Sequence, residues 1–121
     1  EKLLDKSRDL GAYAKSRFEE MKSRYDIIGE VRGLGLSIGV DLVKDRESKA
    51  GDKNAAAKIC CRAWEKGVLL IYLADGVLRI QPPLVITKEE LDKAINIIEE
   101  SIADYLNGNI PDEILKFAKG W

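Results

Sequence analysis

Residues 76–84 have the sequence Gly76-Val77-Leu78-Arg79-Ile80-Gln81-Pro82-Pro83-Leu84, which places one arginine on a short predicted strand. Residue types alternate from position 77 to position 81, so Leu78 and Ile80 should face one side of the strand and Arg79 the other. The two prolines end the strand, because proline donates no hydrogen bond to a neighbouring strand. We therefore expect one guanidinium group on a short strand that is followed directly by a rigid Pro-Pro segment.

Arg79 has two interpretations. A single arginine on a strand is most often a solvated surface residue. Its planar guanidinium group also matches the geometry of a carboxylate, which makes Arg79 a candidate anion-binding residue. The choice between the two depends on the rest of the sequence.

The composition narrows the class of protein. The chain has 121 residues, of which 45% are hydrophobic and 34% charged, and this is typical of one soluble globular domain. Its 20 basic residues nearly balance its 21 acidic residues, so no basic surface is expected. No apolar run reaches the length of a membrane span, and no signal peptide is visible. We predict a cytoplasmic protein with neither nucleic acid nor a membrane as a partner.

Few residues are suited to catalysis. The chain contains no histidine, the commonest general base and metal ligand. Cys60 and Cys61 are adjacent on a predicted helix, where neighbouring side chains point apart, so we expect buried thiols and no disulfide. The lysines lie on charged faces rather than in apolar stretches that would make one a nucleophile. We predict no catalytic, cofactor-binding or metal-binding residue in this chain.

Three helices are predicted from apolar residues that recur every three or four positions. The first covers about the first two dozen residues. The second runs from about Asn54 to Lys66, and Gly67 follows it as a C-cap. The third begins at the capping box formed by residues 87–90 and ends at Gly108. The residues expected on the buried faces are Leu3, Leu10, Ala14, Phe18, Met21, Tyr25, Ala56, Ile59, Cys60, Ala63, Trp64, Leu91, Ile95, Ile98, Ile102 and Tyr105.

The strands lie between these helices. Residues 27–33 form a short extended piece, and residues 34–42 alternate without a break, with the even-numbered apolar residues toward the core. Gly35 and Gly39 lie on the other face, which is either bare or covered by another domain or subunit. Residues 68–72 are predicted as a buried strand that leads through a hairpin into the strand of Arg79.

The resulting order is helix, strand, helix, hairpin, helix. It predicts an α+β fold in which helices cover a small, mostly antiparallel sheet. Glu1 is not a natural start, and the first residues already have a helical pattern. We therefore expect a piece of a longer protein.

Four blocks of the chain form an ordered set. The blocks are Gly29-Glu30-Val31-Arg32-Gly33-Leu34-Gly35-Leu36, Ile38-Gly39-Val40-Asp41-Leu42-Val43, Glu65-Lys66-Gly67-Val68-Leu69 and Leu78-Arg79-Ile80-Gln81-Pro82-Pro83-Leu84-Val85-Ile86-Thr87. In this order they resemble the C-terminal small domain of class III pyridoxal-phosphate aminotransferases. The resemblance covers roughly residues 1–106 and is strongest to 4-aminobutyrate aminotransferases. It divides the chain into a small domain, residues 1–107, and a tail, residues 108–121.

The resemblance implies a function for a longer parent protein with the small domain of fold-type I enzymes. Such an enzyme moves an amino group from 4-aminobutyrate or a similar ω-amino donor to 2-oxoglutarate. Its cofactor, pyridoxal phosphate, would be bound mainly by a large domain absent from this sequence. The chain alone should then be inactive, with that large domain as its partner and a homodimer or larger assembly as the whole protein.

The resemblance also implies roles for two arginines. The family's arginine in the strand before Pro-Pro binds the substrate carboxylate, and that position is Arg79 here. Arg32 lies in the family's R-G-x-G-L motif, where we expect only a structural role at the domain interface.

Two alternatives stay open. Within the family, the parent could be an ornithine or acetylornithine aminotransferase or a related pyridoxal-phosphate racemase. Outside it, the chain could be an independent α+β module that binds a small acid through Arg79 and serves regulation. A regulatory module of that kind typically has the order β-α-β-β-α-β, whereas this chain opens with a long helix, which favours the aminotransferase interpretation.

Overall fold

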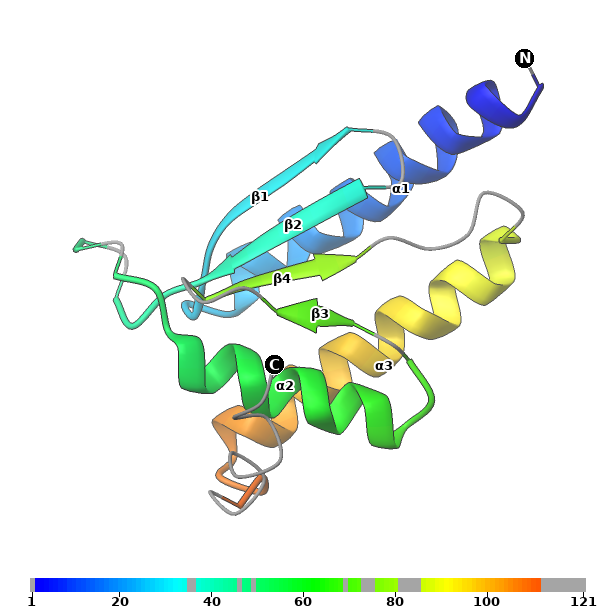
Figure 1. Cartoon of the computed structure of the whole chain (residues 1–121). Helices are drawn as coiled ribbons and strands as arrows, with labels where there is room; N and C mark the ends of the chain where they lie inside the picture. The colour runs from blue at the N-terminus through cyan, green and yellow to red at the C-terminus, as the bar shows by residue number, and fades with distance from the viewer. Residues whose placement is uncertain are drawn as a thin grey trace.

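The computed structural model describes residues 2–34, 37–45, 47–48, 50–68, 70–72, 76–80 and 86–111. Helices and strands follow the order that the sequence predicts, and the extended piece near residue 30 is a full strand (Figure 1). The predicted α+β fold is therefore confirmed. The elements are α1 (Lys2–Arg24), β1 (Ile28–Leu34), β2 (Ser37–Leu42), α2 (Lys53–Glu65), β3 (Ile71–Tyr72), β4 (Val77–Ile80) and α3 (Lys88–Leu106).

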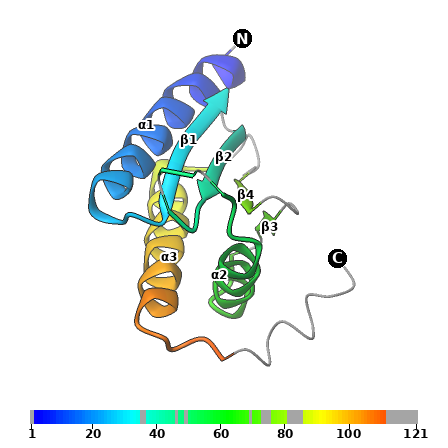
Figure 2. The same ribbon diagram turned by 90° about the vertical axis from the view of Figure 1, so that its left-hand side faces the viewer.

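One four-stranded sheet organises the described fold, with the strand order β1-β2-β4-β3. Strand β2 pairs antiparallel with β1 and with β4, and β3 pairs antiparallel with β4. The three helices lie on one side of this sheet (Figures 1 and 2). We call the other side the outer face, because no helix of the described chain covers it. None of the described helices combines the length and the apolar composition that crossing a membrane requires.

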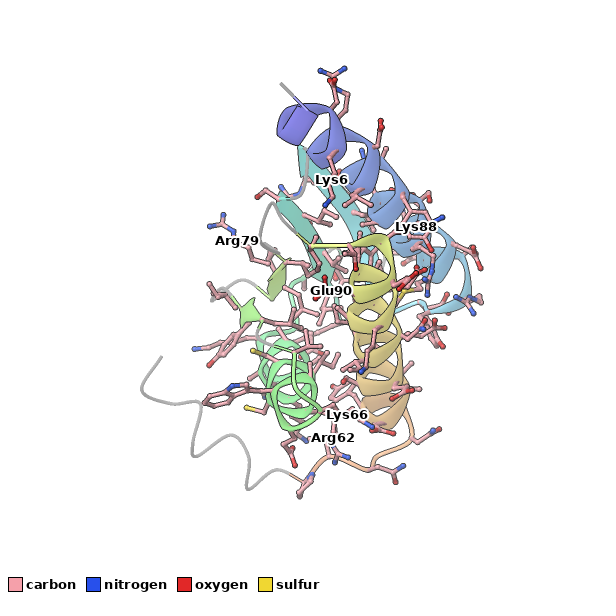
Figure 3. All side chains as sticks on the ribbon, turned by 90° about the vertical axis from the view of Figure 1, so that its right-hand side faces the viewer. Lys6, Arg62, Lys66, Arg79, Lys88 and Glu90 are labelled. Atoms are coloured by element: carbon pink, nitrogen blue, oxygen red, sulfur yellow. The ribbon has the colours of Figure 1, made fainter. Side chains whose placement is uncertain are left out.

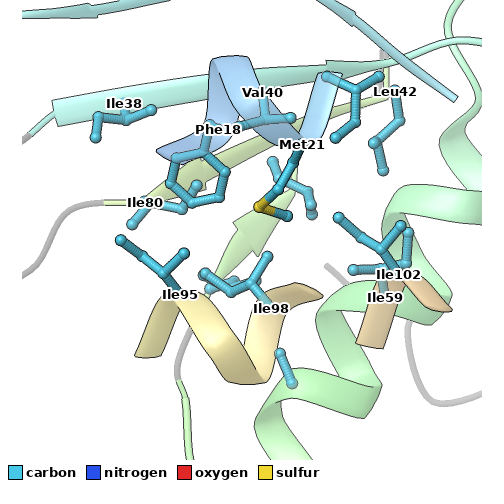
Figure 4. Packing of buried hydrophobic residues seen from close by; sticks show 14 of the residues in the cluster. Phe18, Met21, Ile38, Val40, Leu42, Ile59, Ile80, Ile95, Ile98 and Ile102 are labelled. Carbon is cyan, nitrogen blue, oxygen red and sulfur yellow. The ribbon is translucent and has the colours of Figure 1, made fainter. Parts of the chain in front are cut away.

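The core lies between the sheet and the helices. Each large apolar side chain buried there stabilises the fold by about 1.5–3 kcal/mol relative to an exposed one. The even-numbered residues of β2 from Ile38 to Leu42 are buried, as their alternation predicts. Figure 4 shows, among others, Phe18 and Met21 of α1, Ile59 of α2, Ile80 of β4 and Ile95, Ile98 and Ile102 of α3 in this cluster.

A hairpin between β1 and β2 replaces the uninterrupted strand predicted for residues 34–42. Leu34 ends β1 and pairs with Ser37, the first residue of β2. Alternation alone could not reveal this reversal, because the residues before and after it fit one period of two. Gly35 and Leu36 lie outside the described residues.

Two residues predicted to be buried near β3 are exposed. Trp64 is 54% exposed and Ile71 is 52% exposed. Strand β3 has only two residues and lies at the edge of the sheet. An apolar run such as residues 68–72 predicts a strand but does not distinguish an edge strand from a central one. Leu70, just before β3, is buried as predicted.

Helix α3 begins at the capping box that the sequence predicts. The Thr87 hydroxyl accepts a hydrogen bond from the Glu90 backbone N–H at 3.1 Å, and the Glu90 carboxylate accepts one from the Thr87 backbone N–H at 3.0 Å. The helix ends before Gly108, whose φ of 75° suits glycine. Gly67, predicted to follow α2, has a φ of 100°.

Some predictions fall on residues that the structure does not describe. These include the exit of the Arg79 strand at residues 81–85, the hairpin turn at residues 73–75, and the helical turns expected in the tail, residues 112–121. The division of the chain at residue 107 also stays a prediction.

Candidate functional site

Arg79 projects from β4 on the outer face. Its neighbours Leu78 and Ile80 are buried in the core, whereas Arg79 is exposed, which confirms the predicted alternation. Figure 3 shows the Arg79 side chain pointing away from the helices. Val77 shares the outer face with Arg79 but is buried. The strand therefore holds the guanidinium group on the open side of the sheet.

The sheet register places Arg32 of β1 in the same cross-strand row as Arg79 of β4. In the sheet register Arg79 pairs with Gly39, and Gly39 pairs with Arg32 on its other side. Gly39 has no side chain, and a Cβ atom there would have only Val77 Cγ1 nearby, at 3.6 Å. The two arginines thus flank a glycine in the middle of the outer face.

The two arginines differ in their partners. Arg32 donates a hydrogen bond from Nη2 to Oδ1 of Asp41 at 2.6 Å, and the side chains are 58% and 25% exposed. No hydrogen bond or ion pair links Arg79 to another residue, within the part of the chain that is described. Arg79 is therefore the cation of this pair that is open to an external anion, and its fork suits a carboxylate. The ion pair of Arg32 lies within the sheet, so its expected role at a domain interface stays a prediction.

Asp41 also lies on the outer face, although the sequence pattern gave no reason to select it as a site residue. It has an odd position in β2, two residues beyond Gly39, so its place on the outer face follows from the alternation of the strand. Its ion pair with Arg32 depends on the register between β1 and β2, which the sequence pattern did not give.

Several other polar contacts hold the helices to one another. Arg17 of α1 donates to Asp92 of α3 at 2.9 Å, and Tyr13 also donates to Asp92. Arg62 of α2 lies 3.4 Å from the Asp104 carboxylate of α3. Figure 3 shows Arg62 and Arg79 in separate parts of the molecule. These contacts join helices on one side of the sheet and do not contribute to the site at Arg79.

A hollow of about 510 Å³ lies elsewhere on the described surface, near the turn between α1 and β1. It does not include Arg79, and three of its lining residues are aspartates. Its lining residues are Asp26, Ile27, Val43, Lys44, Asp45, Asp52 and Leu106.

The described residues show no nucleophile prepared for covalent chemistry. Every lysine whose side chain is described is at least partly exposed. Cys60 is buried, its S–H donates to the Leu70 carbonyl at 3.2 Å, and burial raises the pKa of its thiol to about 12. Both cysteines are free thiols, as predicted. The described part of the chain therefore offers a candidate anion-binding group rather than a prepared nucleophile.

Comparison with known proteins identifies this type of domain. The solved structure "Transaminase with L-ala" has a TM-score of 0.81 and 32% identity, over 88% of this chain and 25% of that chain. The fold is thus one that occurs within transaminases. Residues 1–102 match the family "Aminotransferase class-III", and the chain belongs to this family.

The similar curated proteins include racemases and aminotransferases. A leucine/methionine racemase of Thermococcus litoralis is 50% identical over 98% of this chain and 27% of its own length. An isoleucine 2-epimerase of Lentilactobacillus buchneri is 46% identical over 91% of this chain and 24% of its own length. An ornithine aminotransferase of Bacillus subtilis is 44% identical over 82% of this chain and 22% of its own length. The chain thus spans about a quarter of the length of the relatives it matches.

Proposed function

We propose that this chain is the C-terminal small domain of a longer pyridoxal-phosphate enzyme that acts on amino acids. Membership of the class III family supports pyridoxal phosphate as the cofactor. The relatives are about four times as long as this chain, which supports a longer parent protein. Among the described residues no buried lysine is available to hold the cofactor, since every described lysine side chain is at least partly exposed. The missing large domain would therefore hold the cofactor, in a cytoplasmic homodimer or larger assembly. Residues 1–107 would form the small domain and residues 108–121 its tail.

Arg79 binds the carboxylate of the substrate in this proposal. The observation that carries it is an exposed guanidinium group on β4 without an ionic partner among the described residues. A guanidinium group can donate two parallel hydrogen bonds to one carboxylate, which fixes both position and orientation. An amino acid and a keto acid both present such a group.

Two reactions are candidates for the parent. Racemisation of a neutral amino acid is favoured by the leucine/methionine racemase and the isoleucine 2-epimerase, which match nearly the whole chain. Amino transfer is favoured by the ornithine aminotransferase. The resemblance of the sequence blocks implies 4-aminobutyrate as the donor and 2-oxoglutarate as the acceptor. Neither racemase nor aminotransferase activity requires a change in the proposed role of Arg79.

The full-length protein distinguishes the two reactions. It would be incubated with pyridoxal phosphate and L-leucine, L-methionine, L-isoleucine or L-alanine, and the D or epimeric product would be measured by chiral chromatography. A parallel series would supply 4-aminobutyrate or ornithine with 2-oxoglutarate and measure glutamate. We expect epimerisation without added keto acid. Glutamate formation without epimerisation would establish the aminotransferase instead.

Arg79 is tested in the same protein by Arg79→Ala and Arg79→Lys. The alanine variant should lose on the order of 2–4 kcal/mol in kcat/KM, because one partner of a buried charged pair is removed in the complex. The lysine variant keeps the positive charge but cannot donate two parallel hydrogen bonds from one planar group, so it should raise KM. Both melting temperatures should stay near the wild-type value, since an exposed strand arginine contributes little to the core. A sharp fall in melting temperature with unchanged kinetics would make Arg79 a structural residue.

A further inference from the structure

Asp41 lies diagonally between the two arginines of the outer face. It lies two residues along β2 from Gly39, and Gly39 pairs with Arg32 on one side and Arg79 on the other. Diagonal neighbours in antiparallel strands are about 7–8 Å apart at the backbone, which long side chains can bridge. The register therefore gives the Asp41 carboxylate two possible partners.

The structure assigns Asp41 to Arg32. The two side chains are 2.6 Å apart, whereas no described residue pairs with Arg79. Glu30 lies directly opposite Asp41 on β1 and is exposed. Like charges directly opposite each other repel, so Glu30 pushes the Asp41 carboxylate away from β1. The attraction of Arg32 offsets this repulsion and keeps the Asp41 side chain on the β1 side. Without Arg32, the nearest cation on the β4 side is Arg79.

We propose that Arg32 is a positioning residue that holds Asp41 on the β1 side of the outer face and so leaves Arg79 free to bind a carboxylate. The inference rests on the proposed role of Arg79. A ligand that had to displace Asp41 would bind less tightly, because part of its binding energy would be used to separate an existing ion pair. Arg32 would thus affect ligand affinity without contact with the ligand.

The full-length protein tests this with L-leucine as the racemisation probe and 2-oxoglutarate as the amino-transfer probe, whichever reaction the wild type performs. Arg32→Gln should raise KM for the probe about fivefold, the size of one surface ion pair, and leave kcat nearly unchanged. Asp41→Asn alone should leave KM near the wild-type value. The double variant Arg32→Gln with Asp41→Asn should return KM to the wild-type value, because no carboxylate then competes for Arg79.

Two further variants separate the possible outcomes. Arg32→Gln with Glu30→Gln removes the repulsion on the β1 side but leaves Asp41 charged and attracted to Arg79, so it should restore KM only in part. In an Arg79→Ala background, Arg32→Gln should have no further effect on KM. If Asp41→Asn failed to rescue Arg32→Gln, or if Arg32→Gln did not change KM while Arg79→Ala did, the positioning role would be wrong and the role of Arg79 would stand. If Arg79→Ala itself left KM unchanged, Arg79 would not bind the substrate carboxylate, and the positioning role of Arg32 would be wrong as well.

Discussion

At the scale of single residues, a glycine just before β4 and a glycine within β2 should respond to substitution in opposite ways. Gly76 has a φ of 89°, and an added Cβ would lie 2.7 Å from the Asp52 backbone nitrogen and 2.9 Å from the Leu42 carbonyl oxygen. Gly76→Ala should therefore destabilise the protein by about 2 kcal/mol or more, since left-handed backbone alone costs about 1–2 kcal/mol outside glycine. Chemical denaturation measures the loss.

Gly39→Ala is the matched control in the neighbouring strand. A Cβ there would meet only Val77 Cγ1 at an ordinary contact distance of 3.6 Å. The substitution should be neutral or stabilise the fold by about 0.4–1 kcal/mol, because alanine reduces the freedom of the unfolded chain. A loss at Gly39 as large as that at Gly76 would mean that the outer face is more crowded than the structure shows.

The two cysteines should be unreactive in the folded protein. Burial raises the pKa of the Cys60 thiol to about 12, and burial together with Glu65 raises the pKa of the Cys61 thiol. The thiolate is the reactive form, so both groups stay protonated and inert at pH 8. Ellman's reagent should label neither cysteine in the native protein and both after unfolding. Rapid labelling of the native Cys61→Ser variant would show that Cys60 is accessible.

At the scale of elements, the capping box should make α3 sensitive to acid. Thr87→Ala should cost about 1 kcal/mol at neutral pH, as is usual for a lost N-cap. Hydrogen bonds from Thr87 lower the pKa of the Glu90 carboxyl. A carboxyl with a lowered pKa stabilises the fold above its ordinary range, and this contribution disappears as the pH falls through the lowered value. At neutral pH the wild type should therefore have a higher melting temperature than Glu90→Gln. The difference between the two melting temperatures should disappear in acid.

Glu89→Gln is the control for the charge at the helix start. Glu89 lies in the same first turn but accepts no hydrogen bond from another described residue. The melting temperature of Glu89→Gln should lie closer to that of the wild type at neutral pH, because no capping hydrogen bond is lost. Equal pH profiles for the two variants would contradict a specific capping role of Glu90.

Periodicity in the sequence predicted which segments form helices and strands more reliably than it predicted which strands pair with one another. The helices and the buried faces of β2 and β4 follow from repeats of about 3.6 and 2 residues, since burial requires those patterns. The hairpin at Leu34 and the exposure of Ile71 were missed, because strand order and edge position depend on contacts far apart in the chain. For the same reason Arg79 could be identified as a candidate, whereas its alignment with Arg32 and Asp41 required the sheet register.

At the scale of the whole molecule, the edge of the sheet presents an apolar surface. Ile71 lies on the edge strand β3, and Trp64 lies on α2, which packs beside β3. Both side chains are more than half exposed. An edge strand has unpaired backbone groups as well, and such edges with apolar side chains promote association. The relatives are about four times longer than this chain, so a longer parent has further chain that could cover the surface.

The isolated 121-residue chain should therefore self-associate as its concentration rises. Ile71→Thr with Trp64→Gln should shift the equilibrium toward the monomer, because it removes the two exposed apolar side chains at this edge. Leu106→Gln is the matched control, since Leu106 is 50% exposed but lies at the end of α3. Sedimentation velocity at low and high concentration measures the effect. If the wild type stayed monomeric throughout, or if Leu106→Gln reduced association as strongly as the double variant, association would not arise from the β3 edge.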